Sequence, residues 1–304
     1  MASPALSTGH AVRLAARAKT LIAQTSGLAP SHLQANLIVL PEKYANDFRL
    51  LCQRNPVPCP LLAESAHPGA VSLLSSRLYG HTTGATTLEI ARDIDLRHDA
   101  PQYLVYQDSV LITDNDNTIT DLTTYWQADH VGFLIGCSYS FEEALASAGL
   151  APRHTTQGRN VPMYRTKIPL CPAGVFTGST YVVSMRPYRA RDIPRVREIT
   201  SRFVATHGEP IAWGWDGAEK LGIVDVARPE WGDAPLSEDG KGVFSRSGGG
   251  GGDDDDEGFV PVFWGCGVTP QEAVMRAGLE GTIMGHKPGH MIVLDVKEGE
   301  VFGV

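Results

Sequence analysis

The sequence lacks any long hydrophobic run. No window approaches 18 uninterrupted apolar residues, so we expect no membrane-spanning helix and no membrane partner. It also lacks an excess of basic residues, because 26 Lys and Arg stand against 34 Asp and Glu, for a net charge of −8. A general nucleic-acid binder needs a basic face, so no nucleic-acid partner is expected.

Cysteines are few and odd in number. Five thiols in 304 residues, with no secretory apolar run near the first residue, indicate reduced cysteines and a cytoplasmic protein. The first acidic residue is Glu42, and Arg13, Arg17 and Lys19 precede it. This pattern fits either an organelle presequence, with the mitochondrial matrix as the compartment, or an amphipathic helix of the fold, which we favour.

The composition that remains is typical of a globular protein, with 42% hydrophobic and 20% charged residues. Short apolar segments alternate with amphipathic ones, which predicts a mixed α/β (α+β) fold. We expect strands at 35–40, 103–106, 131–135, 180–185, 222–226, 260–264 and 290–295. We expect helices at 10–24, 44–53, 141–148, 193–206 and 270–277.

We expect two subdomains. Residues 1–125 plus 200–304 would form a larger, layered α/β core, and residues 126–199 a smaller inserted two-layer α+β sandwich. Residues 247–258 contain six glycines, four aspartates and one glutamate. Such a segment has little to pack and repels itself, so we expect a flexible Gly/Asp loop there.

Two segments align without a gap at an offset of 129 residues. Residues 131–150 and 260–279 are identical at eight of 20 positions, where chance gives about one, which indicates an internal repeat. Each segment reads as a strand, a Gly-Cys turn and a short helix. We expect Ser140 and Thr269 to be the helix N-caps.

The two turns place Cys137 and Cys266 at equivalent positions shortly before a helix. A thiol beside a helix N-terminus can have a lowered pKa and act as a nucleophile or base. The same backbone N–H groups can instead hold a substrate carboxylate. The alternative is that each cysteine is a small buried hydrophobic residue, and the sequence leaves these interpretations open.

Arginine and histidine supply further candidates. Arg186 directly follows the strand predicted at 180–185, where it can clamp a carboxylate or form an ion pair. His286 and His290 have the spacing of a helical zinc pair, but Pro288 and Gly289 between them prevent a helix. We therefore expect no metal site.

Several longer motifs resemble the bacterial "putative hydro-lyase" family, whose eukaryotic relatives carry a D-glutamate cyclase domain. The likeness covers about residues 25 to 296. It is carried by TSGLAPSHLQANLIVLPEKYANDF, DLRHDAPQYLVYQD, FLIGCSYSFEEAL, RHTTQGRNVPMYRT, VVSMRP, PVFWGCGVTPQ and HKPGHM.

This resemblance implies a lyase that removes water from a small acidic amino acid, for example by closing D-glutamate to 5-oxo-D-proline, without a cofactor. The family tends to have His-Gly-x-Pro-x-His, whereas here the segment that starts at His207 ends in Ala212. That departure leaves a third possibility open, a non-catalytic protein that binds a carboxylate.

Ring closure needs a cation for the α-carboxylate, a base, donors for the oxyanion and an acid for the leaving oxygen. We predict the catalytic groups to be Cys137, Cys266, His207 and His286. We predict the substrate-binding groups to be Arg186, Arg165, Ser138, Ser184 and Thr166. The alternative enzyme is a cofactor-independent racemase or epimerase that uses the two thiols. In every case the expected partner is a small carboxylate, and a homodimer is the default assembly.

Overall fold

The computed structural model describes residues 6–81, 87–112, 118–246 and 258–303. The predicted Gly/Asp loop therefore lies outside the described residues, except for Gly258. The strands are β1 (His32–Pro41), β2 (Leu61–Ser65), β3 (Leu74–Ser76), β4 (Tyr103–Gln107), β5 (Val110–Leu111), β6 (His130–Gly136), β7 (Met163–Pro169), β8 (Thr180–Arg189), β9 (Ala212–Trp213), β10 (Phe259–Gly265), β11 (Thr282–His286) and β12 (Ile292–Lys297). The helices are α1 (Gly9–Arg17), α2 (Ala45–Arg54), α3 (Glu142–Ser147), α4 (Arg153–Thr156), α5 (Ile193–Thr200), α6 (Gly214–Leu221), α7 (Val268–Arg276) and α8 (Glu298–Phe302).

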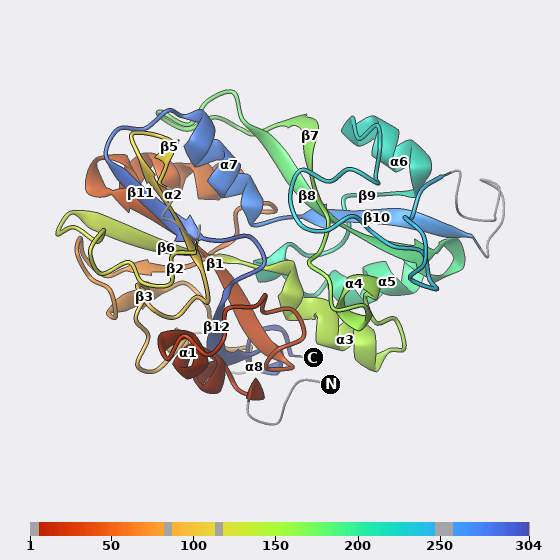
Figure 1. Ribbon diagram of the computed structural model, residues 1–304, viewed down its shortest axis with the longest axis horizontal. Coiled ribbons are helices and arrows are strands. Elements are labelled where there is room, and N and C mark those ends of the chain that lie inside the picture. The colour runs from red at the N-terminus through yellow and green to blue at the C-terminus, as the bar shows by residue number, and fades with distance from the viewer. Residues whose placement is uncertain (1–5, 82–86, 113–117, 247–257, 304) are drawn as a thin grey trace.

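The described strands form two sheets, which confirms the mixed α/β class. The larger sheet has the order β3-β2-β6-β1-β11-β4-β5, and β12 also pairs with β1. The smaller sheet has the order β7-β8-β10-β9. Figure 1 shows the two sheets side by side, with α1 and α2 beside the larger sheet and α5 and α6 beside the smaller one.

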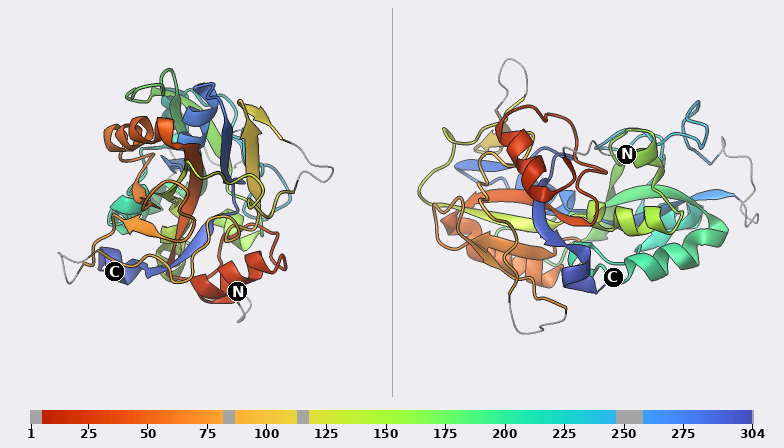
Figure 2. Two further views of the ribbon diagram at one scale, coloured as in Figure 1. Left: turned by 90° about the vertical axis from the view of Figure 1, so that its left-hand side faces the viewer. Right: turned by 90° about the horizontal axis from the view of Figure 1, so that it is seen from below.

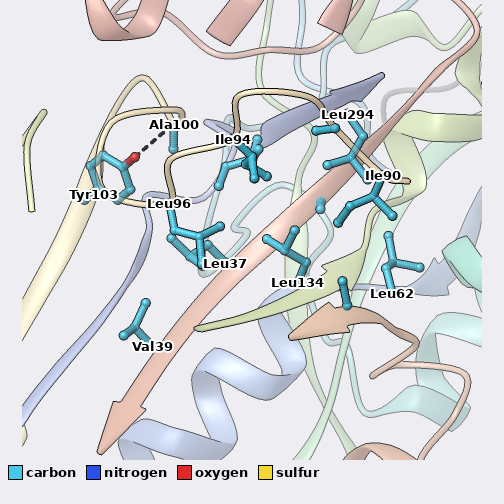
Figure 3. Close-up of a cluster of buried hydrophobic side chains, with 14 of the residues drawn as sticks. Leu37, Val39, Leu62, Ile90, Ile94, Leu96, Ala100, Tyr103, Leu134 and Leu294 are labelled. Atoms are coloured by element: carbon cyan, nitrogen blue, oxygen red, sulfur yellow. Dashed lines mark hydrogen bonds between the residues drawn. The ribbon is translucent and has the colours of Figure 1, made fainter. Parts of the chain in front are cut away.

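Strand β1 is buried along its whole length because both faces of the larger sheet are covered. Leu37 and Val39 point into one apolar cluster with Leu134 and Leu294, which Figure 3 shows in close-up. The alternate residues, such as Ile38, join a second cluster on the opposite face. A strand covered on both sides reads as a continuous apolar run, which is why the sequence predicts it well.

The smaller sheet has two different faces. Val183 and Met185 of β8 pack with α6 in an apolar cluster. Ser184 and Arg186 alternate with them and therefore point to the other face. There Trp264 of β10, the cross-strand partner of Ser184, packs with residues of α3 and α5.

The chain crosses between the sheets at the two Gly-Cys turns. Strand β6 belongs to the larger sheet, but α3, which follows it, packs through Leu145 against the smaller sheet. Strand β10 belongs to the smaller sheet, but α7 packs through Ala273 and Val274 against the larger one. Figure 2 shows the ribbon from two other sides. The turns therefore lie at the junction of the sheets.

Several predicted elements are wrong in extent or type. Residues 222–226 are not a strand, because Gly222 ends α6 in the left-handed conformation (φ 84°) and irregular chain follows it. Strand β8 does not stop before Pro187 but continues to Arg189, so Arg186 lies inside a strand. Helix α1 ends at Arg17 and α5 at Thr200, both earlier than predicted.

The predicted subdomain division does not coincide with the sheets. Strand β6 lies within 126–199 but belongs to the larger sheet, and β9 and β10 lie outside it but belong to the smaller sheet. Sheet membership alone does not delimit a subdomain, so the division remains a prediction.

The basic N-terminal segment forms a helix of the fold. Arg13 of α1 is fully buried and donates to the Asp295 carboxylate of β12 at 3.0 and 2.9 Å. Arg17 of the same helix donates to Asp99 at 2.5 Å. Among the described helices, none combines the length and the apolar character needed to span a bilayer.

Candidate functional site

Each aligned segment folds as a strand, a turn and a helix, as predicted, but the N-caps differ. Ser140 lies within a 3-10 turn (Ser138–Phe141) that begins after Cys137, and Thr269 is already the second residue of α7. Both hydroxyls bind neighbouring strands instead of their own helices. Ser140 Oγ accepts from the Gln34 N–H of β1 at 3.0 Å, and Thr269 Oγ1 accepts from the Val182 N–H of β8 at 2.9 Å. These contacts hold both turns in place, while their origin by duplication remains a prediction.

Each turn also reaches across to the opposite sheet. After β6, Ser138 Oγ lies 3.5 Å from Ser184 Oγ of the smaller sheet. After β10, Gly267 lies so close to Asn36 of the larger sheet that a Cβ atom there would be 1.9 Å from Asn36 Nδ2. Ser138 and Gly267 are equivalent in the sequence alignment. Each turn therefore contacts a polar side chain of the sheet opposite its own strand.

The two thiols lie in one apolar cluster, together with Tyr139, Met163 and Met291. Cys137 and Cys266 are each only 6% exposed. Burial raises the pKa of Cys137 well above its usual range and that of Cys266 to about 11. Of the interpretations that the sequence left open, the structure favours buried neutral thiols over thiols of lowered pKa, because the loss of hydration outweighs the N–H of Tyr139 at the Cys137 sulfur and that of Val268 at the Cys266 sulfur.

Arg186 is the charged centre of the site and is fully buried. Its Nε and Nη2 donate to Glu142 Oε1 at 3.0 and 2.6 Å. Its Nη1 donates to Ser184 Oγ at 3.1 Å, and its Nη2 to Ser138 Oγ at 3.0 Å. These bonds use four of the five N–H groups of a guanidinium. A two-point clamp on a substrate carboxylate would therefore require Arg186 to release a partner.

Glu142 holds Arg186 in place. It is 4% exposed, and its carboxylate also accepts from Thr155 Oγ1 at 3.1 Å and lies 3.1 Å from His154 Nε2. Burial alone would raise the pKa of Glu142, but His154 and Arg186 lower it to about 2. The Glu142–Arg186 pair is therefore fully charged at neutral pH, and each charge compensates the other.

The hydroxyl groups of Ser138 and Ser184 together carry one hydrogen that the two residues and Arg186 cannot accept. Ser138 Oγ and Ser184 Oγ each accept one N–H from Arg186, and each carries one hydrogen of its own. One hydroxyl can donate to the other across 3.5 Å, but both cannot do so at once. At least one buried hydroxyl hydrogen thus points to an acceptor other than these two residues.

His207 lies between the two turns. Its ring nitrogen Nδ1 lies 3.4 Å from the position a Cβ atom would take on Gly265, and the Gly136 carbonyl also faces the ring. Nδ1 contacts the Val57 carbonyl at 2.8 Å and must carry the proton, since a carbonyl only accepts. Nε2 is buried without a hydrogen-bond partner. Burial lowers the pKa of His207 to about 4, so the ring is neutral with a free lone pair on Nε2.

The backbone of His207 is strained as well. Its φ is 86°, in the left-handed region that residues with a Cβ rarely adopt. Such strain persists only where the surrounding structure enforces it, and it is concentrated at functional sites. This conformation brings the imidazole to the Gly-Cys turns.

His286 has the opposite proton arrangement. Its Nδ1 accepts from the Leu37 N–H at 3.1 Å and faces Gln271 Nε2 at 2.9 Å, which places the proton on Nε2. This Nε2 is also buried without a partner, and burial lowers the pKa of His286 to about 4. The contacts of His286 are to β1 and α7 and do not include Arg186.

The structure brings together Cys137, Cys266, Ser138, Ser184, Arg186 and His207. Arg165 makes a separate contact, donating to Glu272 at 2.8 and 3.1 Å beside the ring of Trp231. The Thr166 hydroxyl donates to the Tyr181 carbonyl at 2.9 Å. The substrate-binding roles of Arg165 and Thr166 remain predictions.

Ala212 lies on the other face of the smaller sheet. It pairs with Phe263, whose side chain packs with α6 in the cluster that contains Met185. Cross-strand partners share a face, and Arg186 alternates with Met185. A histidine at this position, which the family resemblance leads one to expect, would therefore not lie on the face that carries Arg186 and Ser184.

Three residues of the site were not predicted from the sequence: Asn36, Glu142 and His154. Asn36 is a polar residue within an apolar strand, and its Nδ2 donates to the Gly136 carbonyl at 2.9 Å. Because it interrupts an apolar run, Asn36 could have been predicted from the sequence as a candidate site residue. Nothing in the sequence indicates that Glu142 pairs with Arg186, 44 positions later.

Curated relatives match nearly the whole chain. A "Putative hydro-lyase" of Schizosaccharomyces pombe is 42% identical over 92% of this chain and 81% of its own length. One of Bordetella petrii is 45% identical over 97% and 96%, and one of Bacillus subtilis is 41% identical over 94% and 96%. A solved nitrogen repressor-like protein of Methanococcus jannaschii covers 93% of each chain at 10% identity, but its TM-score of 0.34 supports no argument.

The family model described as D-glutamate cyclase matches residues 131–295. This range includes both Gly-Cys turns and the segment that carries Arg186 and His207. The match spans more than half of the chain, and relatives named as hydro-lyases cover nearly all of it. The chain therefore belongs to the D-glutamate cyclase family and is related to proteins that are named as hydro-lyases.

Proposed function

We propose that this chain is a lyase of the hydro-lyase type that closes D-glutamate to 5-oxo-D-proline. A bond forms between the amine nitrogen and the γ-carboxyl carbon, and one γ-carboxyl oxygen leaves as water. The atoms balance without an oxidant or a further reactant. The family match and the names of the relatives support the class of reaction.

One observation carries the proposal: the paired hydroxyls of Ser138 and Ser184, both held by Arg186. Attack of the amine on the γ-carboxyl creates an oxyanion, which preorganised donors in a buried site stabilise strongly. A hydroxyl that already accepts from a guanidinium is a stronger donor, because hydrogen bonds in a chain polarise one another. We assign the leftover hydroxyl hydrogen to this oxyanion.

We assign the base to His207. Its Nε2 lone pair takes the proton that the substrate amine must lose before it attacks, and the imidazolium passes that proton to the departing oxygen. The nitrogen loses its second proton to Nε2 after the C–N bond has formed, and that proton also goes to the departing oxygen, which leaves as water. A buried ring with a pKa of about 4 is a weak base, so it returns the proton readily. His286, with its proton on Nε2, remains the alternative acid.

Arg186 acts as a positioning residue in this proposal. Glu142 neutralises its charge, and its N–H groups orient the two hydroxyls. The neutral thiols of Cys137 and Cys266 line the turns beside them. An uncharged thiol is a weak nucleophile, so the proposal gives neither cysteine a covalent step.

The test follows D- and L-glutamate, related amino acids and 2-hydroxy acids in D₂O by ¹H and ¹³C NMR. We expect D-glutamate to form 5-oxoproline with its α-hydrogen retained. Ser184→Ala should lower kcat by about 10²- to 10³-fold. The exposed Ser201→Ala is the matched control. Ring closure no faster than without protein would contradict the proposal, and saturable binding without turnover would favour a carboxylate-binding protein.

A racemase or epimerase is the second candidate because two thiols at equivalent turns share one cluster. In that reaction one cysteine removes the α-proton and the other returns a proton from the opposite side. The raised pKa values of both thiols disfavour it. Deuterium entering the α-carbon, with activity lost in both Cys137→Ala and Cys266→Ala, would establish it in place of the cyclase.

A further inference from the structure

Asn36 carries a hydrogen-bond acceptor that no residue of the described chain uses. Its side chain is 3% exposed, and its Nδ2 donates to the carbonyls of Gly136 and Ile135 at 2.9 and 3.3 Å. Because a carbonyl only accepts, these two partners identify Nδ2 as the NH₂ end of the amide. Oδ1 accepts no hydrogen bond from the described residues, and it is not one of their fully enclosed unpartnered atoms, so a small molecule can still reach it.

Gly267 places a free donor beside this acceptor. A Cβ atom on Gly267 would lie 2.7 Å from Asn36 Oδ1, so glycine is needed for the amide to lie against the turn. The Gly267 N–H donates to none of the described residues. Gly267 is the N-cap of α7, a helix of nine residues, so this N–H lies at the positive end of the helix dipole. The donor favours an anionic group, and the acceptor favours an N–H group.

The proposed base contacts the same part of the turn. The Gly136 carbonyl that accepts from Asn36 Nδ2 also faces the ring of His207. His207 Nδ1 lies 3.4 Å from the position that a Cβ atom would take on Gly265, two residues before Gly267. An amine bound to Asn36 Oδ1 would therefore lie beside the histidine whose Nε2 has no partner.

Arg186 leaves the α-carboxylate of an amino acid without a clamp. Its hydrogen bonds to Glu142, Ser138 and Ser184 use four of its five N–H groups. An α-amino acid carries an anionic carboxylate and an amine on the same carbon atom. A free N–H next to a free carbonyl oxygen matches this pair of groups, and a water molecule that filled the same place would be displaced by it.

We propose that the second Gly-Cys turn binds the head group of the amino-acid substrate. The α-carboxylate accepts from the Gly267 N–H, and the amine donates to Asn36 Oδ1. Asn36 thereby selects substrates that carry an amine and holds this amine beside His207. The assignment rests on the proposed function for the identity of the ligand, D-glutamate.

The test compares the binding of D-glutamate with that of glutarate, which lacks only the amine, by isothermal titration calorimetry. The titrations use the full chain with Ser138→Ala and Ser184→Ala, in which ring closure is slow enough for equilibrium binding to be measured. D-Glutamate should bind about tenfold or more tightly than glutarate. Adding Asn36→Ala should weaken D-glutamate binding by about 10- to 100-fold and glutarate binding by less than about threefold. The exposed Asn46→Ala is the matched control and should leave both affinities unchanged.

A second measurement keeps the test decisive if the alanine variant fails to fold. In protein labelled with ¹³C at the asparagine Cγ atoms, one resonance should shift with D-glutamate and stay in place with glutarate. The same resonance should be missing from the spectrum of the isosteric variant Asn36→Asp. A resonance that responds equally to both ligands would overturn the assignment.

The outcomes separate this assignment from ring closure itself. Equal affinities for the two ligands, no binding of D-glutamate, or a preference that Asn36→Ala leaves unchanged would overturn the assignment, and the turn would then hold water only. Turnover of D-glutamate by the wild type together with such a result would leave the proposed function standing. A preference that depends on Asn36 without turnover by the wild type would support the assignment and contradict the proposed function.

Discussion

The ion pair of Glu142 and Arg186 should make folding stability depend on pH in a way that one substitution removes. The pKa of Glu142 is about 2 in the folded chain and about 4.3 in an unfolded one. Because the folded-state pKa is the lower one, the pair contributes its full stability above the unfolded-state pKa. That contribution is lost as the pH falls towards 2.

The magnitude follows from these two pKa values. Between pH 6 and pH 3 Glu142 becomes protonated in the unfolded chain but stays ionised in the folded one. This difference lowers the free energy of unfolding by about 2 kcal/mol. Urea denaturation at a series of pH values measures this loss. Glu142→Gln should be less stable than wild type at pH 6, by about 3 kcal/mol, because it leaves Arg186 buried without its countercharge. That difference should shrink by about 2 kcal/mol at pH 3.

Glu143→Gln is the matched control, since Glu143 lies on the same helix and accepts from Ser147 rather than from Arg186. Its unfolding free energy should keep the wild-type dependence on pH. If the difference between wild type and Glu142→Gln is the same at pH 6 and pH 3, Glu142 is not held as a carboxylate by Arg186. The pairing of Glu142 with Arg186 in the buried network would then be refuted.

Three further predictions concern the turns and the site. Gly267→Ala places a Cβ atom 1.9 Å from Asn36 Nδ2 and should lower the free energy of unfolding, measured with urea, by about 1–3 kcal/mol. The double variant with Asn36→Ala should recover part of this loss. If the effects of the two substitutions simply add, the contact is contradicted. His207→Gln should lower kcat by about 10²- to 10⁴-fold while the circular dichroism spectrum is unchanged, and wild-type activity would exclude His207 as the base. Ser138→Ala should lower kcat more than KM changes, because the hydroxyl acts on the transition state, and a change in KM alone would assign it to substrate binding.

The elements that the sequence predicts well are those that local patterns determine. The apolar runs of β1, β6 and β10 are strands, as predicted. Such features depend on neighbouring residues only. For the same reason the Gly-Cys turns were found from the alignment of 131–150 with 260–279.

The features that the sequence did not predict depend on residues that are distant in the chain. Ser140 and Thr269 have N-cap spacing, but strands more than 80 positions away compete for their hydroxyls. Arg186 reads as the end of a strand because Pro187 follows it, yet Pro187 faces Pro261 in the sheet, where β8 continues. Which residue pairs with Arg186 depends on how α3 packs against the smaller sheet, and no local sequence pattern indicates that packing.

The most direct test of ring closure at Ser138 and Ser184 uses D-glutamate labelled with ¹⁸O in both γ-carboxyl oxygens. Mass spectrometry of the 5-oxoproline formed by wild type should show one retained label and one lost to water. The variant with both serines replaced by alanine should form the same product at least 10²-fold more slowly. Equal rates for wild type and this variant, or no product above the protein-free control, would contradict the account.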